Sequence, residues 1–261
     1  MASGRLRPDQ IGASATVSPA RHSCFSGGAS NMRIHLLHPW DVTVSQALQI
    51  QKRLRKCLIF EPSAKPFRTV AGADVACERS GNYAFASVAV FTLPDLKILE
   101  EAFAEARLTF PYVPGLLSFR EVPPLLDAFR KLKVVPDVVL CDGQGFAHPR
   151  RMGLACHLGL ALDLATVGCA KSVLVGKFRL PGPRRGARSQ LRLGKEKVGI
   201  VLRTRTGVKP VFVSPGHRMD FRRAVEVVLE TTRTFRLPEP IRWAHRQAGA
   251  LSRRRLVKSL A

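Results

Sequence analysis

Three acidic residues occupy positions where a carboxylate could take part in metal-dependent chemistry. Asp74 interrupts the otherwise apolar stretch TVAGADVAC, Asp142 follows the apolar run DVVLC, and Glu121 lies in the first turn of a segment with helical spacing. A carboxylate is costly to bury unless it is paired or bound to a metal, and oxygen ligands suit Mg²⁺. If the two apolar stretches are neighbouring strands, the three acids can hold Mg²⁺ for phosphodiester hydrolysis.

Each of these acids also has a purely structural explanation. Ser118 and Glu121 have the S-x-x-E spacing of a helix capping box, which would explain Glu121 by helix stability alone. Asp142 and Gly143 could form a simple turn, and Asp74 could pair with one buried base. A metal site has the advantage that it explains all three positions together.

A stiff turn comes just before the helical segment that carries Glu121. Tyr112 lies in the sequence PYVPG, in which two prolines and a glycine would hold the tyrosine in a fixed position. A rigid aromatic ring beside a metal centre can enter a base stack and help to take one base out of it. Ordinary packing of the ring is the alternative.

The segment that follows Asp142, GQGFAHPRRMG, has features of a ligand-binding loop. Gly143 and Gly145 would allow the backbone to approach a ligand closely. Arg150 and Arg151 could bind phosphate in front of the next helix. A lone G-x-G is weak evidence, but here it comes directly after a candidate metal ligand.

Three further basic residues are candidates for the same site. His148 and His217 could transfer a proton or contact phosphate, and Lys171 follows the apolar run ATVGCA, whose end could point into the site. Solvent-exposed loop histidines and a surface lysine are the alternatives.

The charge balance indicates a polyanionic partner. The 261 residues include 42 Lys and Arg against 19 Asp and Glu, a formal net charge of +23. A surplus of this size is unfavourable through self-repulsion unless a polyanion relieves it. Nucleic acid is the first candidate, an anionic membrane the second, and a genome that favours arginine is the alternative explanation.

The cysteines and the hydropathy indicate a cytoplasmic protein without a membrane partner. None of the six cysteines forms a C-x-x-C pair, so a zinc site is not expected, and five lie in apolar runs where we expect buried thiols. No apolar stretch approaches the roughly 20 residues that a membrane helix needs.

Hydrophobic periodicity predicts a mixed α/β fold, a sheet flanked by helices. The predicted helices cover residues 42–58, 117–132, 151–164 and 219–232. The predicted strands cover residues 69–77, 83–93, 96–108, 137–141, 165–170, 198–203 and 210–213, with a hairpin turn at Gly81–Asn82.

The chain divides into one domain and two extensions. Residues 1–31 are rich in Ser, Gly, Ala and Arg and are expected to be disordered; a transit peptide, or a true start at Met32, would also fit. Residues 32–245 form the predicted catalytic domain, and residues 246–261 a basic tail. We expect a monomer, because no apolar surface helix is left over.

Six segments resemble the motifs of the endonuclease V family, in the expected order between about residues 32 and 245. They are AGADVAC, PYVPGLLSFREVP, DGQGFAHPRRMGLACHLG, TVGCAKSVLVGKF, VFVSPGHR and RLPEPIRWAH. The resemblance implies a ribonuclease H-like fold with a five-stranded central sheet and a requirement for Mg²⁺, with Mn²⁺ as a substitute. It also implies cleavage of inosine-containing DNA at the second phosphodiester 3′ to the inosine, as the first step of repair, with 3′-hydroxyl and 5′-phosphate ends.

The resemblance also implies roles for individual residues. The implied metal ligands are Asp74, Glu121 and Asp142. The implied catalytic partners are His217, which would support the metal or the scissile phosphate, and Lys171. The implied substrate-binding residues are the wedge Tyr112 with Pro114 and Gly115, the base pocket of Gly143, Gln144, Gly145 and His148, and Arg150.

The sequence departs from the family pattern in three places, and two other functions stay open. Residues 1–31 lie outside the similarity, residues 179–197 hold seven Arg and Lys against one acid, and His245 stands where the family pattern has an acid. Inosine-specific cleavage of single-stranded RNA is one alternative function. A module that recognises damage without cutting is the other.

Overall fold

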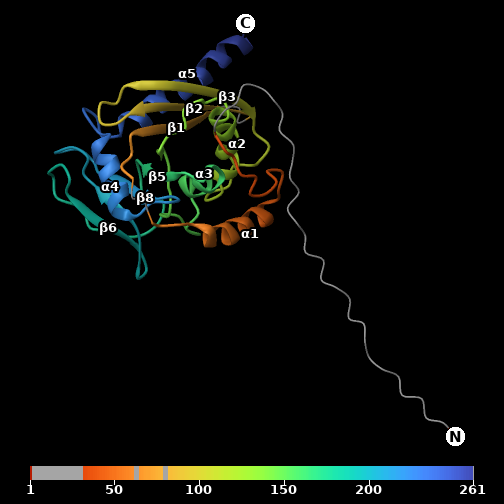
Figure 1. Cartoon of the computed structure of the whole chain (residues 1–261), viewed down its shortest axis with the longest axis horizontal. Coiled ribbons are helices and arrows are strands. Elements are labelled where there is room, and N and C mark those ends of the chain that lie inside the picture. The colour runs from red at the N-terminus through yellow and green to blue at the C-terminus, as the bar shows by residue number, and fades with distance from the viewer. Residues whose placement is uncertain (2–31, 62–64, 79–81, 261) are drawn as a thin grey trace.

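The computed structural model describes Met1 and residues 32–61, 65–78 and 82–260. Its centre is one mixed sheet with helices against both faces (Figure 1). The strands are β1 (Thr69–Cys77), β2 (Tyr83–Thr92), β3 (Ile98–Arg107), β4 (Val138–Cys141), β5 (Ala165–Ala170), β6 (Arg188–Leu193), β7 (Glu196–Leu202) and β8 (Val211–Pro215). The helices are α1 (Val44–Leu54), the short 3₁₀ helix η1 (Arg55–Cys57), α2 (Ser118–Phe129), α3 (Leu154–Leu162), α4 (Phe221–Glu230) and α5 (Glu239–Leu260).

The sheet is wider than predicted. Its eight strands follow the order β3-β2-β1-β4-β5-β8-β7-β6, three strands more than the predicted five-stranded central sheet. The pairs β1–β4 and β4–β5 are parallel, and the other pairs are antiparallel. The unpredicted strand β6 (RSQLRL) is an edge strand of polar and basic residues, and such a strand lacks the run of apolar residues that signals a buried one.

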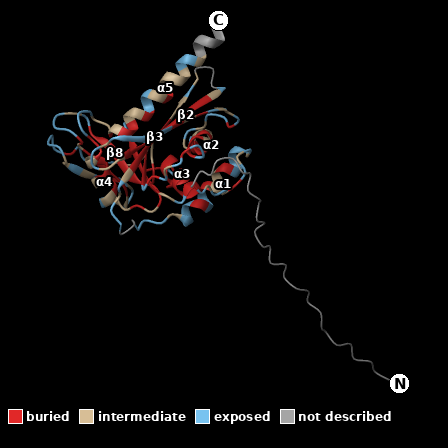
Figure 2. Cartoon of the chain, turned by 45° about the horizontal axis from the view of Figure 1, so that its top comes forward, coloured by how far each residue is buried: buried red, intermediate tan, exposed pale blue. Residues whose placement is uncertain are grey.

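Alternate side chains of the central strands pack into two separate hydrophobic clusters. On β1, Ala71 and Ala73 face the cluster that contains α2 and α3, whereas Val70 faces the cluster that contains α4 and α5. The short strands β4 and β5 are buried along their whole length, which explains their uninterrupted apolar sequences. Figure 2 shows these buried layers inside an exposed shell.

Helix α5 lies across β1 and β2 at unusually close range. A Cβ atom added to Gly72 would lie 2.0 Å from the carbonyl oxygen of Pro240, so only glycine allows this approach. The helix continues to Leu260, and the segment expected to be a basic tail therefore forms its last turns. This packing brings a helix that the sequence pattern did not predict against the strand that carries Asp74.

Several smaller expectations have different outcomes. Cys141, Cys156 and Cys169 are buried but Cys57 and Cys77 are exposed, so fewer cysteines are buried than predicted. Residues 2–31, predicted to be disordered, and Gly81 of the predicted turn lie outside the described residues. In the part of the chain that the structure describes, every helix is too short or too polar to cross a membrane.

Replacing Gly72 by alanine should destabilise the fold, because the new methyl group meets backbone atoms that cannot rotate away. We expect the free energy of unfolding to fall by about 1–3 kcal/mol, the usual cost of overpacking, in urea titrations. The control is Gly182→Ala, where the nearest atom to the added Cβ is Ala187 Cβ at 3.9 Å. Equal stability of the two variants would contradict the close packing of α5 on β1.

Candidate active site

The parallel pairing of β1 with β4 places two carboxylates next to each other. Ala73 is the register partner of Cys141, and the amide of Asp142 donates to the Ala73 carbonyl at 3.2 Å. The next residue on β1 is Asp74, so the Asp74 and Asp142 side chains leave adjacent strands at the same level. The sequence-based placement of these two acids side by side is confirmed in this geometry.

His245 of α5 joins the two acids. Its Nδ1 lies 2.6 Å from Asp74 Oδ2 and 3.7 Å from Asp142 Oδ2. Among the described residues these three form a group whose potential metal-ligand atoms all lie within 4.8 Å of one another. Sequence reasoning noted His245 only as a departure from an expected acid, because no periodicity revealed the helix that brings it here.

Lys171 points into the site, as predicted. It follows β5, the strand next to β4, and its Nζ lies 2.6 Å from Asp142 Oδ2. A positive charge at this position partly neutralises the two aspartates, and an ammonium group can donate charge-assisted hydrogen bonds to an anionic phosphate.

Glu121 approaches the aspartates from the other face of the sheet, in the first turn of α2. Burial, together with repulsion from Asp74 and Asp142, raises the pKa of its carboxyl well above the ordinary value. The predicted capping box does not form, because α2 has no side-chain cap and Ser118 Oγ contacts His157 Nδ1 at 3.0 Å instead. Helix capping therefore does not explain Glu121.

Electrostatic repulsion marks this cluster as a site for a cation. Burial raises the pKa of the Asp74 carboxyl to about 6, Asp142 adds to the rise, and His245 opposes it. The two carboxylates and the imidazole offer the oxygen and nitrogen donors that divalent metals bind in proteins. The donor set therefore fits a divalent ion.

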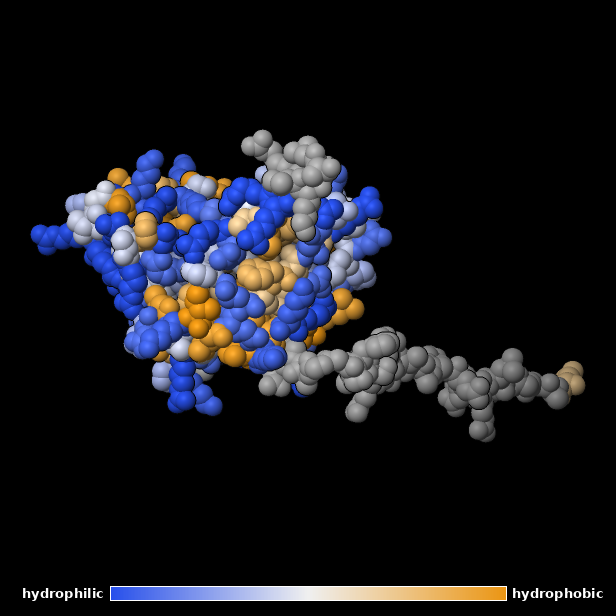
Figure 3. Space-filling model, turned by 90° about the horizontal axis from the view of Figure 1, so that it is seen from above, coloured by the Kyte–Doolittle hydropathy of each residue, from blue (hydrophilic) through white to orange (hydrophobic). Residues whose placement is uncertain are grey.

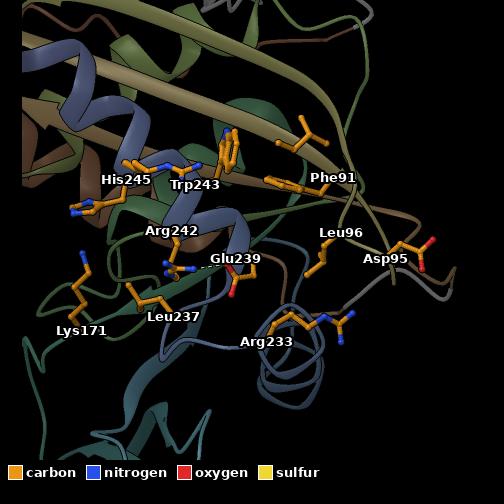
Figure 4. Close-up of a pocket in the computed structure, with 12 residues that line it drawn as sticks. Phe91, Asp95, Leu96, Lys171, Arg233, Leu237, Glu239, Arg242, Trp243 and His245 are labelled. Atoms are coloured by element: carbon orange, nitrogen blue, oxygen red, sulfur yellow. Dashed lines mark hydrogen bonds and ion pairs between the residues drawn. The ribbon is translucent and has the colours of Figure 1, made fainter. Parts of the chain in front are cut away.

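Two hollows adjoin the cluster. One, of about 530 Å³, contains Asp74, Asp142 and His245 together with residues of α5 further along the helix. The other, of about 590 Å³, has Lys171 and His245 at one end and Asp95 at the other (Figure 4). His245 lines both hollows, whereas the two aspartates line only the first.

The stiff turn before α2 presents Tyr112 to solvent, with 72% of the residue exposed. The turn is held through the Gly115 carbonyl, which accepts hydrogen bonds from Gln51 Nε2, His148 Nε2 and Arg150 Nη2 at 3.1, 2.9 and 2.6 Å. Ordinary packing therefore does not explain the Tyr112 ring. Pro114 of the same turn is also exposed.

His148 is buried and holds the neighbouring backbone by hydrogen bonds, and its imidazole is not exposed as an acid or a base. Its Nε2 donates to the Gly115 carbonyl, so its Nδ1 is free to accept from the amides of Arg150 and Met152. Burial, helped by the nearby Arg150 charge, lowers the pKa of its imidazole to about 4. Both ring nitrogens already have protein partners.

The glycine-rich loop packs backbone against backbone. A Cβ on Gly145 would lie 2.3 Å from the Pro215 carbonyl oxygen, and a Cβ on Gly168 would lie 2.3 Å from the Gly145 nitrogen. Gly143 is less confined, with Leu154 Cδ2 at 3.3 Å from its added Cβ. Gln144 ties the loop to the segment after β5 by donating to the Ser172 carbonyl at 2.9 Å.

His217 lies away from the acids. It follows β8, which runs antiparallel to β5, and its carbonyl accepts from Thr166 at the start of β5, whereas Lys171 follows the end of that strand. Its Nε2 lies 3.2 Å from Asp163 Oδ1, and the amide of Ile59 donates to its Nδ1. The prediction that His217 supports the metal does not fit this position, because the two ends of one strand separate the groups.

Comparisons with known proteins agree with the site. The sequence model described as Endonuclease V matches residues 51–246. A protein of Nostoc punctiforme named Endonuclease V is 46% identical over 220 residues, which are 84% of this chain and 100% of the relative.

Solved structures lead to the same group. The crystal structure of Endonuclease V from Streptomyces avermitilis is 40% identical, with a TM-score of 0.78 over 88% of this chain and 99% of that one. Endonuclease V of Ciona intestinalis, solved in complex with a DNA that contains inosine, is 26% identical, with a TM-score of 0.71 over 84% of this chain and 99% of that one.

The metal-free chain should lose stability as pH rises through the pKa of Asp74. The folded state holds the Asp74 proton up to about pH 6, whereas the unfolded chain releases it near pH 4, so unfolding becomes easier between these values. Urea titrations in EDTA should show Asp74→Asn more stable than the native chain at pH 7 by on the order of 3 kcal/mol. The two should converge at pH 4.

Added Mg²⁺ at pH 7 should then stabilise the native chain and leave Asp74→Asn nearly unchanged, because only the native cluster binds the ion in its folded state. A difference between the two chains that does not change with pH would show that Asp74 is not held among repelling charges.

Proposed function

The chain belongs to the endonuclease V family, and from this premise we propose that it cuts DNA strands that contain inosine, at the second phosphodiester 3′ to the inosine. Members of this family are nucleases, hydrolases that act on DNA. The observation that carries the proposal is the convergence of Asp74 of β1, Asp142 after β4 and His245 of α5, beside Lys171. The Ciona intestinalis relative bound to inosine-containing DNA supports the choice of substrate.

The family is metal-dependent, and Mg²⁺, with Mn²⁺ as a substitute, is the ion that we propose for this chain. Asp74, Asp142 and His245 would hold it, with Glu121 leaning over them from α2. A bound ion of this kind lowers the pKa of water and offsets negative charge on phosphate.

The residues of the chain orient the strand for hydrolysis. Water adds to phosphorus and the bond from phosphorus to the 3′ oxygen breaks, which leaves 3′-hydroxyl and 5′-phosphate ends. Lys171 Nζ, which donates to Asp142 Oδ2, would contact the scissile phosphate.

Recognition of the lesion is assigned to the two segments that meet at the Gly115 carbonyl. The exposed ring of Tyr112 would fill the gap that a flipped base leaves. The base would enter beside Gly143, Gln144 and Gly145. In this proposal His148 and Arg150 act by holding the turn that presents Tyr112.

The fold and setting of this activity are part of the proposal. The strand order β3-β2-β1-β4-β5 supports a ribonuclease H-like core, to which β8, β7 and β6 are added at one edge. We expect the chain to act as a cytoplasmic monomer, with residues 1–31 as a disordered extension of the catalytic domain.

Cleavage of end-labelled strands with one inosine tests the function. With Mg²⁺ the native chain should cut duplex or single-stranded DNA at the second bond 3′ to inosine, and EDTA should stop it. Asp142→Asn should lower the rate by about a thousandfold, since metal-ion stabilisation is worth several kcal/mol, and still bind DNA. Asp127→Asn, on the exposed surface of α2, is the matched control and should keep full activity.

The same strands made as RNA separate the alternatives. Faster cutting of inosine in single-stranded RNA would make the chain an endoribonuclease. Binding without cutting of any strand would make it a recognition module.

Removing the Tyr112 ring should reduce selectivity rather than stability. Stacking of a base on an aromatic ring is worth about 1–3 kcal/mol, so Tyr112→Ala should lower the ratio of kcat/KM on inosine-containing and undamaged strands by about tenfold. Tyr112→Phe keeps the ring and should keep the ratio. An equal loss on both strands would exclude the wedge role, and an unchanged Tm is expected because the side chain is exposed.

A further inference from the structure

The rotation of α5 about its own axis is fixed by one apolar stripe. Ile241, Ala244 and Ala248 are fully buried, and the helix packs on β1 and β2. Spacings of three and four residues place these side chains on one face. Every other face of the helix therefore has a defined direction relative to the strand that carries Asp74.

A second stripe on the flank of α5 is basic. Arg242, Arg246, Gly249 and Arg253 follow one another at spacings of four, three and four residues, which puts them in one row. Arg246, Gly249 and Arg253 line the hollow that contains Asp74, Asp142 and His245. Arg242 and Arg246 line the neighbouring hollow, in which Figure 4 labels Arg242. The row thus runs alongside the candidate active site.

The arginines of α5 differ in whether a carboxylate neutralises them. Arg242 pairs with Glu239 at 2.6 Å, and Arg255 pairs with Glu105. Arg246 and Arg253 are exposed and have no ion-pair partner among the described residues, although both border a hollow that contains two aspartates. Unpaired cations are thus placed beside the acids without neutralising them, which suits a ligand that carries its own negative charge.

Local contacts restrain the guanidinium groups of Arg246 and Arg253. Arg246 lies over the ring of Trp243 at 4.3 Å, and the Trp243 indole in turn donates to Glu101. Arg253 folds back toward Gly249, where an added Cβ would lie 3.3 Å from Arg253 Nη1. Glycine inside a helix costs roughly 0.5–1 kcal/mol relative to alanine, and here it leaves a notch in the row between the two arginines.

We propose that Arg246 and Arg253 form a phosphate-binding ridge on α5, which holds the sugar–phosphate backbone of the strand next to the bond to be cut. This rests on the proposed nuclease function. The two residues are about 10 Å apart along the helix axis, the axial length of about three nucleotides in duplex DNA. The family model matches residues 51–246, so Arg246 is the last residue of that match and Arg253 lies beyond it.

Hydrophilic residues cover much of the face of the molecule seen in Figure 3, with apolar side chains grouped between them.

The salt dependence of binding tests the ridge. The association constant of a fluorescein-labelled duplex is measured by anisotropy in EDTA over a series of KCl concentrations, with and without inosine. Each phosphate contact contributes about 0.9 to the log–log slope. Arg253→Gln should therefore reduce the slope by about 0.9, and the double variant with Arg246→Gln by about 1.8, on both duplexes.

The matched control is Arg254→Gln, which removes the same charge one residue further on. Arg254 lines a different hollow, with Lys131 and Phe103, and should leave the slope unchanged. Equal effects of Arg253→Gln and Arg254→Gln, or no effect of Arg253→Gln, would overturn the ridge. Because the slope is measured without cleavage and on undamaged DNA, it does not depend on whether the chain cuts at inosine.

Discussion

Repulsion between two carboxylates on adjacent parallel strands is the constraint around which this protein is arranged. Backbone pairing of β1 with β4, together with the hydrogen bond from the Asp142 amide to the Ala73 carbonyl, fixes the backbone of Asp74 and Asp142 at one level. The low-dielectric sheet makes their mutual repulsion larger than it would be in water, and Glu121 increases it from the opposite face. Such an arrangement is unfavourable for the fold alone, and it is consistent with the metal dependence of the family.

The surroundings offset this repulsion only in part. Lys171 supplies one charge at the end of β5, and His245 supplies a ring nitrogen from α5. The position of His245 depends on the approach of α5 to β1, which Gly72 allows because it has no side chain. A glycine on β1 and a histidine far along the chain thus serve the same centre, although they are separated by most of the sequence.

How much of the fold and of the candidate site could be predicted depends on how clearly the apolar pattern of each element appears in its sequence. β1, β2, β4 and β5 are apolar enough to predict, and with them came the placement of Asp74 and Asp142. The edge strand β6 and the helix α5 were missed, since β6 is polar and basic and α5 buries only a narrow stripe under many arginines. Two other expectations depended on tertiary contacts that the sequence does not show. Ser118 contacts His157 and forms no capping box, and His148 hydrogen-bonds to the Gly115 carbonyl and so holds the turn.

Some of the many arginines donate hydrogen bonds to backbone carbonyls, and others are free to contact a ligand. Composition alone does not distinguish these two groups. Arg185 donates to the Leu229 and Thr232 carbonyls, and Arg203 donates to carbonyls of the segment before β6. Arg236 bridges the Lys171 and Pro210 carbonyls in the same way. These guanidinium groups still add to the electrostatic field, but their donors already satisfy backbone acceptors that long loops would otherwise leave unpaired. The formal charge of +23 therefore overstates the number of cations free to contact a phosphate.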